Sequence, residues 1–135
     1  MRSGWLILVL LCSLTPALPA APGSWQAPLA EVRLAVAGRL YRSEPAVPPP
    51  VALSVAETSA LSHVGWRFRL PAGRRVQAWL CQGEQCLPLG SARRGRFQAP
   101  PGWVAERPLH LRFRLPAGEN RALTVQAPRL TVEYR

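Results

Sequence analysis

The sequence CQGEQC holds two cysteines, Cys81 and Cys86, whose spacing allows three kinds of chemistry: a disulfide, part of a zinc site, or a redox centre. Apolar, strand-like residues precede Cys81 and follow Cys86, which predicts a hairpin with the four-residue loop QGEQ. Residues opposite each other in a hairpin are close enough for a disulfide. We therefore predict a structural Cys81–Cys86 bridge that fixes the register of the hairpin.

The zinc and redox alternatives have less support. Zinc would need further ligands, but the two histidines, His63 and His110, are far apart and lack the spacing of zinc-finger ligands. A redox-active cysteine pair has two intervening residues rather than four. We expect neither a metal nor a cofactor.

Residues that would support catalysis are sparse. The seven acidic residues are all glutamate, and the common nucleophile, phosphate-loop and metalloprotease motifs do not occur. Ser62 precedes His63, but adjacency in sequence is not the geometry of a catalytic triad. We predict that the protein is not an enzyme.

The basic residues form the second group with definite chemistry. All 17 are arginine, and the formal net charge is +10. The heptapeptide RFRLPAG occurs at 67–73 and again at 112–118, with arginines alternating with apolar residues. If both copies lie in one sheet, four guanidinium groups share a face that can bind carboxylates or phosphates; otherwise they are separately solvated. The predicted partner-binding basic face comprises Arg67, Arg69, Arg112 and Arg114.

The elements that must position these residues are short strands. Apolar and other residues alternate with a period of two, as in half-buried antiparallel strands, and Pro/Gly-rich breakers separate the runs. Fifteen prolines leave room for one helical turn, at 55–62. We predict an all-β antiparallel sandwich, immunoglobulin-like or chaperone-like, with about seven or eight strands. The alternating segments are 32–36, 51–55, 66–70, 76–80, 109–115, 123–125 and 130–134.

The N-terminus has the layout of a secretory signal: one arginine, a short apolar run, then small residues and prolines. We predict a cleaved signal peptide at 1–20 and a single domain at 21–135, without a membrane-spanning segment. Leu11 disfavours lipidation of Cys12, because a lipobox has a small residue there. Export from the cytoplasm makes nucleic acid an unexpected partner, despite the charge.

A family resemblance covers nearly the whole mature chain. The order and spacing of GSWQAP, GWRFRLPAGRRVQAWLCQGEQCLPL, LHLRFRLPAG and LTVQAPRLTVEYR resemble the flagellar FlhE family. The proline-rich stretch 43–50 departs from that family; we expect either an ordered polyproline-like crossing or a mobile loop there.

The resemblance implies a non-enzymatic periplasmic accessory protein of bacterial flagellum assembly. It implies a chaperone-like role or a limit on proton leakage through the flagellar export apparatus, with export-gate, rod or filament components as partners. A homo-oligomer remains open. The main alternative is a secreted basic module that binds anionic cell-envelope polymers; a small inhibitor that presents the QGEQ loop is a third.

Overall fold

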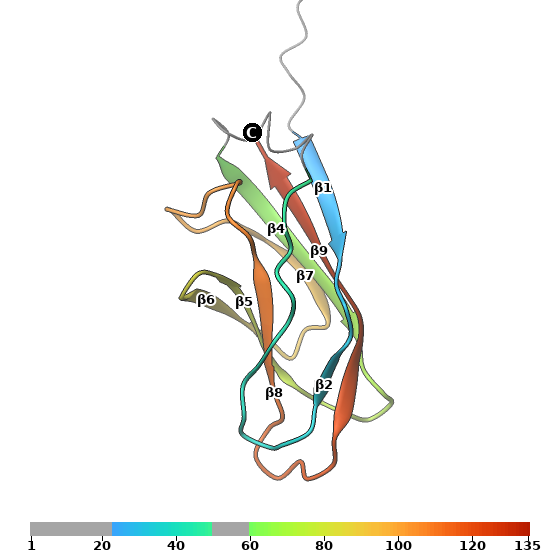
Figure 1. Cartoon of the computed structure of the whole chain (residues 1–135). Coiled ribbons are helices and arrows are strands. Elements are labelled where there is room, and N and C mark those ends of the chain that lie inside the picture. Colours follow the sequence, from blue (N-terminus) through green and yellow to red (C-terminus); the bar gives the residue numbers. More distant parts are fainter. Residues whose placement is uncertain (1–22, 50–59) are drawn as a thin grey trace, which may run out of the picture.

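The computed structural model describes residues 23–49 and 60–135, which form two antiparallel sheets packed face to face (Figure 1). The prediction of an all-β sandwich is confirmed. The expected signal peptide and the expected strand at 51–55 lie outside the described residues. Of the expected helical turn at 55–62, the described end is extended, because Leu61 and Ser62 begin a strand. Within the described residues, no helix is long and apolar enough to cross a bilayer.

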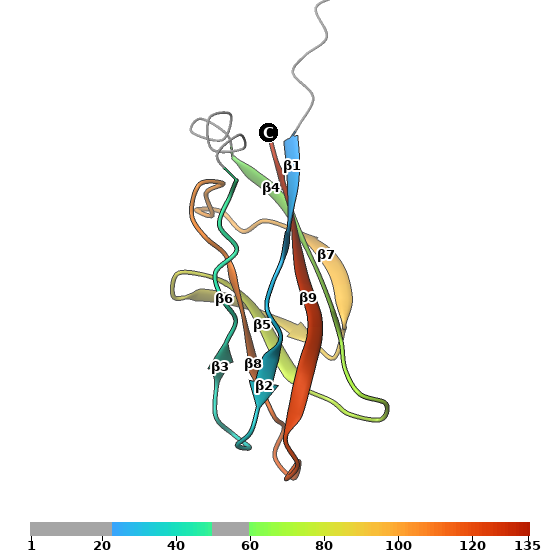
Figure 2. The same ribbon diagram turned by 45° about the vertical axis from the view of Figure 1, so that its right-hand side comes forward.

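The first sheet has the strand order β1-β9-β4-β7, and β2 pairs with the other half of the long strand β9 (Figure 2). The first strand of the domain therefore lies beside the last, while β4 and β9 occupy the middle of the sheet. The strands are β1 (Gly23–Pro28), β2 (Val32–Leu34), β4 (Leu61–Arg69), β7 (Arg94–Gln98) and β9 (Leu123–Tyr134).

The second sheet has the order β3-β8-β5-β6 and packs against the first sheet through the inward side chains of both. Its strands are β3 (Tyr41–Arg42), β5 (Gln77–Gln82), β6 (Gln85–Gly90) and β8 (His110–Arg114). The described part of the chain thus has nine strands rather than seven or eight.

The core lies between the sheets, and at its centre the two copies of the RFRLPAG repeat contact each other. Phe68 of β4 and Phe113 of β8 meet edge to face, with ring centroids 5.3 Å apart. Both rings are almost fully buried. Because neighbouring side chains of a strand point to opposite faces, the arginines that flank each phenylalanine point away from the core. Each sheet thus contains one copy of the repeat, which forms the end of a strand and the turn that follows it.

One strand is longer than its sequence pattern indicates. Segments 123–125 and 130–134 were expected as separate strands because QAPR looked like a breaker, but both belong to β9. Ala127 takes a positive φ of 47°, and Pro128 is buried beside it. The chain bends at this point without leaving the sheet, so one half of β9 pairs with β1 and the other with β2.

The predicted disulfide is present, with an S–S distance of 2.02 Å between Cys81 and Cys86. The hairpin that carries it is tighter than expected. Gln82 pairs with Gln85, so the loop has two residues rather than four. Gly83 opens the loop with a φ of 59°, a conformation that suits glycine at the first position of a type II′ turn. The two cysteines are 4.1 Å apart at Cα, as in the closer of the two antiparallel pair types.

The described part of the proline-rich stretch is an ordered crossing along β8. The backbone of Ser43 donates to Leu111 O at 2.8 Å, and its hydroxyl accepts from Leu111 N at 2.9 Å. Ala46 exchanges two backbone hydrogen bonds with Leu109. These contacts bury Ser43 and Ala46 and continue the pairing that β3 begins.

Arg74 links the turns that follow the two repeats. It comes directly after the first PAG, and Glu119 directly after the second. Arg74 Nε donates to Glu119 Oε2 at 3.2 Å, and its other nitrogens donate to the carbonyl oxygens of Arg121 and Ala122. Since the Arg74 side chain is only 11% exposed, one guanidinium satisfies three acceptors of the opposite turn and joins the two sheets at one end.

Replacing this guanidinium should therefore destabilise the fold. We expect Arg74→Ala to lower the free energy of unfolding by about 2 kcal/mol, because it leaves a carboxylate and two carbonyl groups without their donor. Urea denaturation of the purified domain measures the change. The matched control is the exposed neighbour, Arg75→Ala, for which we expect a change below about 0.5 kcal/mol. Equal losses in both variants would contradict the structural role of Arg74.

Candidate functional site

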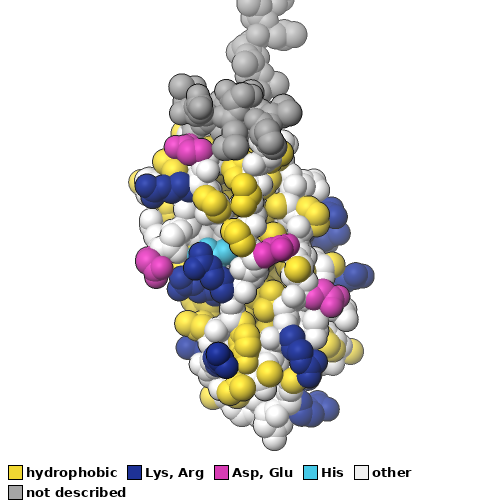
Figure 3. Space-filling view, viewed as in Figure 1, with side chains coloured by type: hydrophobic (Ala, Val, Ile, Leu, Met, Phe, Trp, Pro, Cys, Tyr) yellow, Lys and Arg dark blue, Asp and Glu magenta, His cyan; other side chains and the backbone are white. Residues whose placement is uncertain are grey.

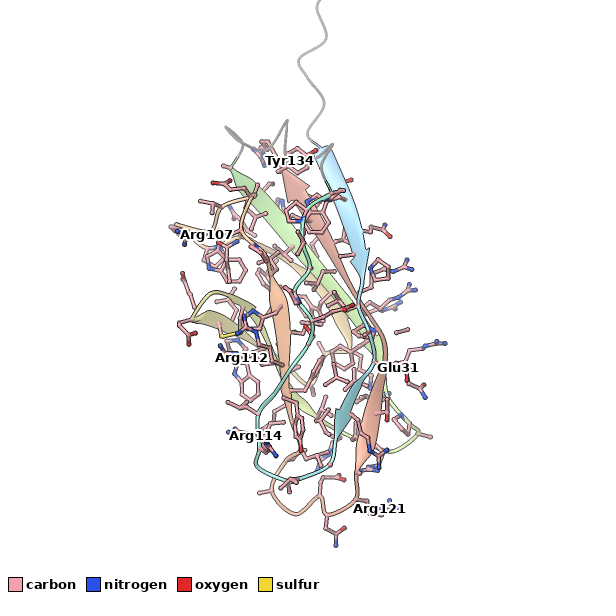
Figure 4. All side chains as sticks on the ribbon, in the orientation of Figure 1. Glu31, Arg107, Arg112, Arg114, Arg121 and Tyr134 are labelled. Atoms are coloured by element: carbon pink, nitrogen blue, oxygen red, sulfur yellow. A yellow bond between two sulfur atoms is a disulfide. The ribbon has the colours of Figure 1, made fainter. Side chains whose placement is uncertain are left out.

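The structure separates the four arginines that were expected to share one face. Arg67 and Arg69 lie on β4 in the first sheet, whereas Arg112 and Arg114 lie on β8 in the second. Figure 4 shows Arg112 and Arg114 projecting from β8 on the side away from β4 and β9. The single basic face was therefore wrong, because the two phenylalanines of the repeats face each other and turn their arginines to opposite outer surfaces.

Arg67 instead belongs to a basic surface built by three strands. In register, Arg67 of β4 lies directly opposite Arg94 of β7 on one side and Arg129 of β9 on the other. Arg96 lies on the same outer face of β7, two residues after Arg94. Here the first arginine face denotes Arg67, Arg94, Arg96 and Arg129. Arg69 is also exposed, but it follows a register shift and pairs with Gln126.

The first arginine face surrounds a hollow of about 570 Å³. Gly65 forms part of its floor, and the lack of a side chain there lets Arg96 reach over β4 to Glu133 of β9, at 2.7 Å. This hydrogen bond holds the pKa of Glu133 below its usual range, so Glu133 remains ionised. Among the residues that the structure describes, Glu133 is the one carboxylate that lines the hollow, against four guanidinium groups.

The row Arg94–Arg67–Arg129 is unfavourable in the isolated domain. Like charges directly opposite each other in a sheet repel. Arg129 Nη1 donates to the uncharged Gln26 at 3.2 Å, and within the described residues none of the three makes a salt bridge. An anionic group over the hollow would relieve this repulsion, and guanidinium groups can bind carboxylates in a bidentate manner.

The second arginine face comprises Arg42, Arg112 and Arg114 on the outer surface of the second sheet. Arg42 and Arg112 lie directly opposite each other on β3 and β8. Arg114 stacks over Trp79, with its guanidinium carbon 5.1 Å from the ring centroid. Figure 3 shows a histidine, in cyan, beside a group of arginines on this side of the molecule.

His110 is buried between two of these arginines. Arg42 Nη2 lies 3.2 Å from His110 Nδ1, and Arg112 Nε lies 3.1 Å from His110 Nε2. A neutral imidazole has one acceptor nitrogen, so it accepts only one of these two contacts as a hydrogen bond. Burial first, and then the charges of Arg42 and Arg112, lower the pKa of His110 from 6.5 to about 4. This histidine is therefore neutral at pH 7.

The remaining candidates do not assemble into a catalytic or metal centre. Ser62 Oγ lies 2.7 Å from His63 Nδ1, and Arg135 Nε donates to the same hydroxyl at 3.3 Å. In the described parts of the chain, no carboxylate hydrogen-bonds the His63 ring, and no group of three metal-ligating side chains occurs. The disulfide leaves neither Cys81 nor Cys86 with a free thiolate that could bind zinc.

Comparison with known proteins identifies the family. The family model described as flagellar protein FlhE matches residues 31–135. The chain belongs to the FlhE family. A solved structure described as the crystal structure of FlhE is 27% identical to it, with a TM-score of 0.64. That alignment covers 86% of this chain and 99% of the other. A search of curated proteins gives no match.

FlhE is a family of flagellar proteins, and the resemblance found in the sequence is confirmed. Sequence reasoning missed Arg94, Arg96 and Arg129 as neighbours of Arg67. Their alternation with Gly95, Phe97 and Leu130 is visible in the sequence. Their proximity depends on β7 and β9 flanking β4, which the alternation alone does not specify.

The lowered pKa of His110 predicts an acid-sensitive contribution to stability. The unfolded chain binds a proton on this histidine near pH 6.5, whereas the folded chain does so only near pH 4. The stability from neutral His110 is thus fully present above pH 6.5 and lost as the pH falls toward 4, by about 3 kcal/mol in total.

Chemical denaturation between pH 4 and pH 7 tests this prediction. His110→Gln should lack this part of the loss, whereas His63→Gln, which leaves the His110 surroundings intact, should retain it. An unchanged pH dependence in His110→Gln would show that burial does not hold His110 neutral.

Proposed function

We propose that this chain is a non-enzymatic periplasmic accessory protein of bacterial flagellum assembly. Membership of the FlhE family over residues 31–135 is the observation that carries the proposal. The signal-like sequence at 1–20 supports export across the inner membrane, and the disulfide suits an oxidising compartment. In this role the protein binds flagellar components, namely export-gate, rod or filament subunits.

Two forms of the role give different phenotypes. A chaperone-like factor keeps flagellar subunits from assembling within the periplasm, so its loss should produce filaments there. A factor that limits proton leakage through the export apparatus should, when lost, let the cytoplasmic pH fall in acidic medium. The sandwich architecture favours the chaperone-like form, because a sheet with open margins can bind an extended segment of another protein.

Deletion of the gene in a motile host tests the proposal. We expect impaired motility, together with periplasmic filaments in electron micrographs for the chaperone-like form or a lowered cytoplasmic pH for the leak-limiting form. The full chain should restore the wild type, whereas residues 21–135 without the N-terminal segment should not. Normal motility, filament placement and cytoplasmic pH in the deletion strain would refute the proposal.

A second candidate function rests on the arginine faces. Both bring arginines into direct opposition across strands, and guanidinium groups can bind the phosphates of a polymer. A module for anionic cell-envelope polymers would bind isolated lipopolysaccharide and lose that binding steeply as salt increases. Cross-linking in the periplasm of motile cells separates the two functions, since a flagellar accessory protein should capture flagellar proteins. The chain has no lysine, so photo-reactive side chains are the suitable cross-linkers.

A further inference from the structure

The strand β7 forms one margin of the first sheet. It pairs with β4 on one side, and within the described residues no strand pairs with it on the other. Figure 2 shows β7 at the outside of the sheet beside β4. The terminal strand β9 lies between β1 and β4 and offers no free margin there.

The hydrogen bonds at the two ends of β7 determine which backbone groups face outward. Ala99 N donates to Ser62 O at 2.8 Å, and Phe68 N donates to Arg93 O at 2.9 Å. Since the direction of backbone groups alternates along an antiparallel strand, Gly95 and Phe97 direct theirs toward β4. The N–H and C=O groups of the alternate residues face the open margin: Arg94, Arg96 and Gln98.

The residues with open backbone groups also carry the charge. Arg94 and Arg96 are exposed on the first arginine face, and Arg94 ends the row of three opposed arginines. In an added strand, side chains opposite Arg94 and Arg96 would lie about 5 Å away, measured between Cβ atoms. A carboxylate opposite Arg94 would pair with an arginine that makes no salt bridge within the described residues, and one opposite Arg96 would share its guanidinium with Glu133.

The inner face of β7 favours apolar side chains at the intervening positions. The indole of Trp66 lies against Gly95, where an added Cβ atom would clash with the ring. Phe97 packs beside it, with ring centroids 5.5 Å apart. Trp66 and Phe97 are only partly buried, so this aromatic pair can bury more surface under an added strand.

The other margins suit such a partner less well. β3 has two residues, and β6 contains Pro88, which lacks an N–H group. β1 has no charged side chain. A second copy of β7 is also a poor partner, because pairing two copies would bring arginines close to arginines.

We propose that the open margin of β7 binds an extended segment of a partner protein in which acidic and apolar residues alternate. The segment adds a strand to the first sheet, and its carboxylates pair with Arg94 and Arg96. This inference deepens the proposed function, on which it rests, by defining the kind of protein segment that the accessory protein would recognise. A phosphate-bearing polymer could meet the arginines but lacks a peptide backbone to pair with the margin.

The probe for this proposal is a fluorescent peptide of alternating Glu and Val residues, with Gln replacing every Glu in the control peptide. Fluorescence anisotropy with the mature domain should show binding of the Glu peptide that weakens with salt, and binding of the Gln peptide at least about ten-fold weaker. Amide hydrogen exchange should slow about ten-fold at Arg94, Arg96 and Gln98 when the Glu peptide is bound.

Two variants separate the backbone contribution from the charge contribution. Gln98→Pro removes one outward N–H group without changing the charge, and Gln98→Ala is its control. Arg94→Glu reverses one charge, and its control is Arg121→Glu in the exposed loop before β9. We expect Gln98→Pro and Arg94→Glu each to weaken Glu-peptide binding about ten-fold, and the controls to change it less than about two-fold. Thermal melts establish that each variant is folded, and Arg94→Glu remains informative if Gln98→Pro is not.

Several outcomes would overturn the proposal. Absence of binding at millimolar peptide would do so. Binding that neither slows exchange at the three amides nor responds to Gln98→Pro would also overturn it, because that result describes a purely electrostatic surface of the kind a phosphate-bearing polymer would use.

The experiments test the β7 binding site and the proposed cellular function separately. A flagellar defect in the deletion strain that Arg94→Glu and Gln98→Pro both restore fully would refute the β7 site and leave the proposed function standing. If the peptide binds as expected but deletion of the protein has no flagellar effect, the β7 site is supported and the proposed function is refuted.

Discussion

The contact between Phe68 and Phe113 is the constraint on which the arrangement of this sandwich depends. Each ring is the inward residue of an RFR triplet, and the two rings meet across the core because the triplets lie in opposite sheets. The turns that follow the triplets then come together, and Arg74 can reach Glu119 and the neighbouring carbonyls. A single apolar pair thus sets which strands face each other, which turns meet, and which surfaces carry the flanking charges.

The same constraint explains why the charge is divided. A strand with one face in the core must direct its polar residues outward, so two facing strands direct them to opposite sides of the molecule. Each outer surface then acquires its own arginines from neighbouring strands: Arg94, Arg96 and Arg129 around Arg67 on one, and Arg42 beside Arg112 on the other. The glycines of the first sheet complete its geometry, since Gly65 leaves the hollow open and Gly95 accommodates Trp66.

Period-two alternation was sufficient to predict the sandwich and most of its strands, and the cysteine spacing predicted the disulfide. Both follow from local rules: which side of a strand a residue occupies, and which residues lie opposite each other in a hairpin.

The features that were not predicted from the sequence depend on non-local pairing or on an unusual local backbone conformation. The alternation at Arg94–Gln98 is visible but weak, since Gly95 provides no apolar side chain, so β7 was missed. The continuity of β9 depends on Ala127 adopting a positive φ, which alanine rarely does. The assignment of the two repeats to different sheets depends on packing across the core, for which neither repeat contains a local signal.

The pairing of β1 with the end of β9 has a consequence for the order in which this chain can fold. Gly23 lies opposite Tyr134, so β1 has no paired strand until β9 is in place. β4 also pairs with β9, and removing the final strand leaves both without the centre of their sheet. Hairpins such as β5-β6 can close early through local contacts, but the first sheet cannot close until β9 takes its place between β1 and β4. The first sheet therefore depends on contacts between residues far apart in the sequence, whereas the β5-β6 hairpin depends on neighbouring ones.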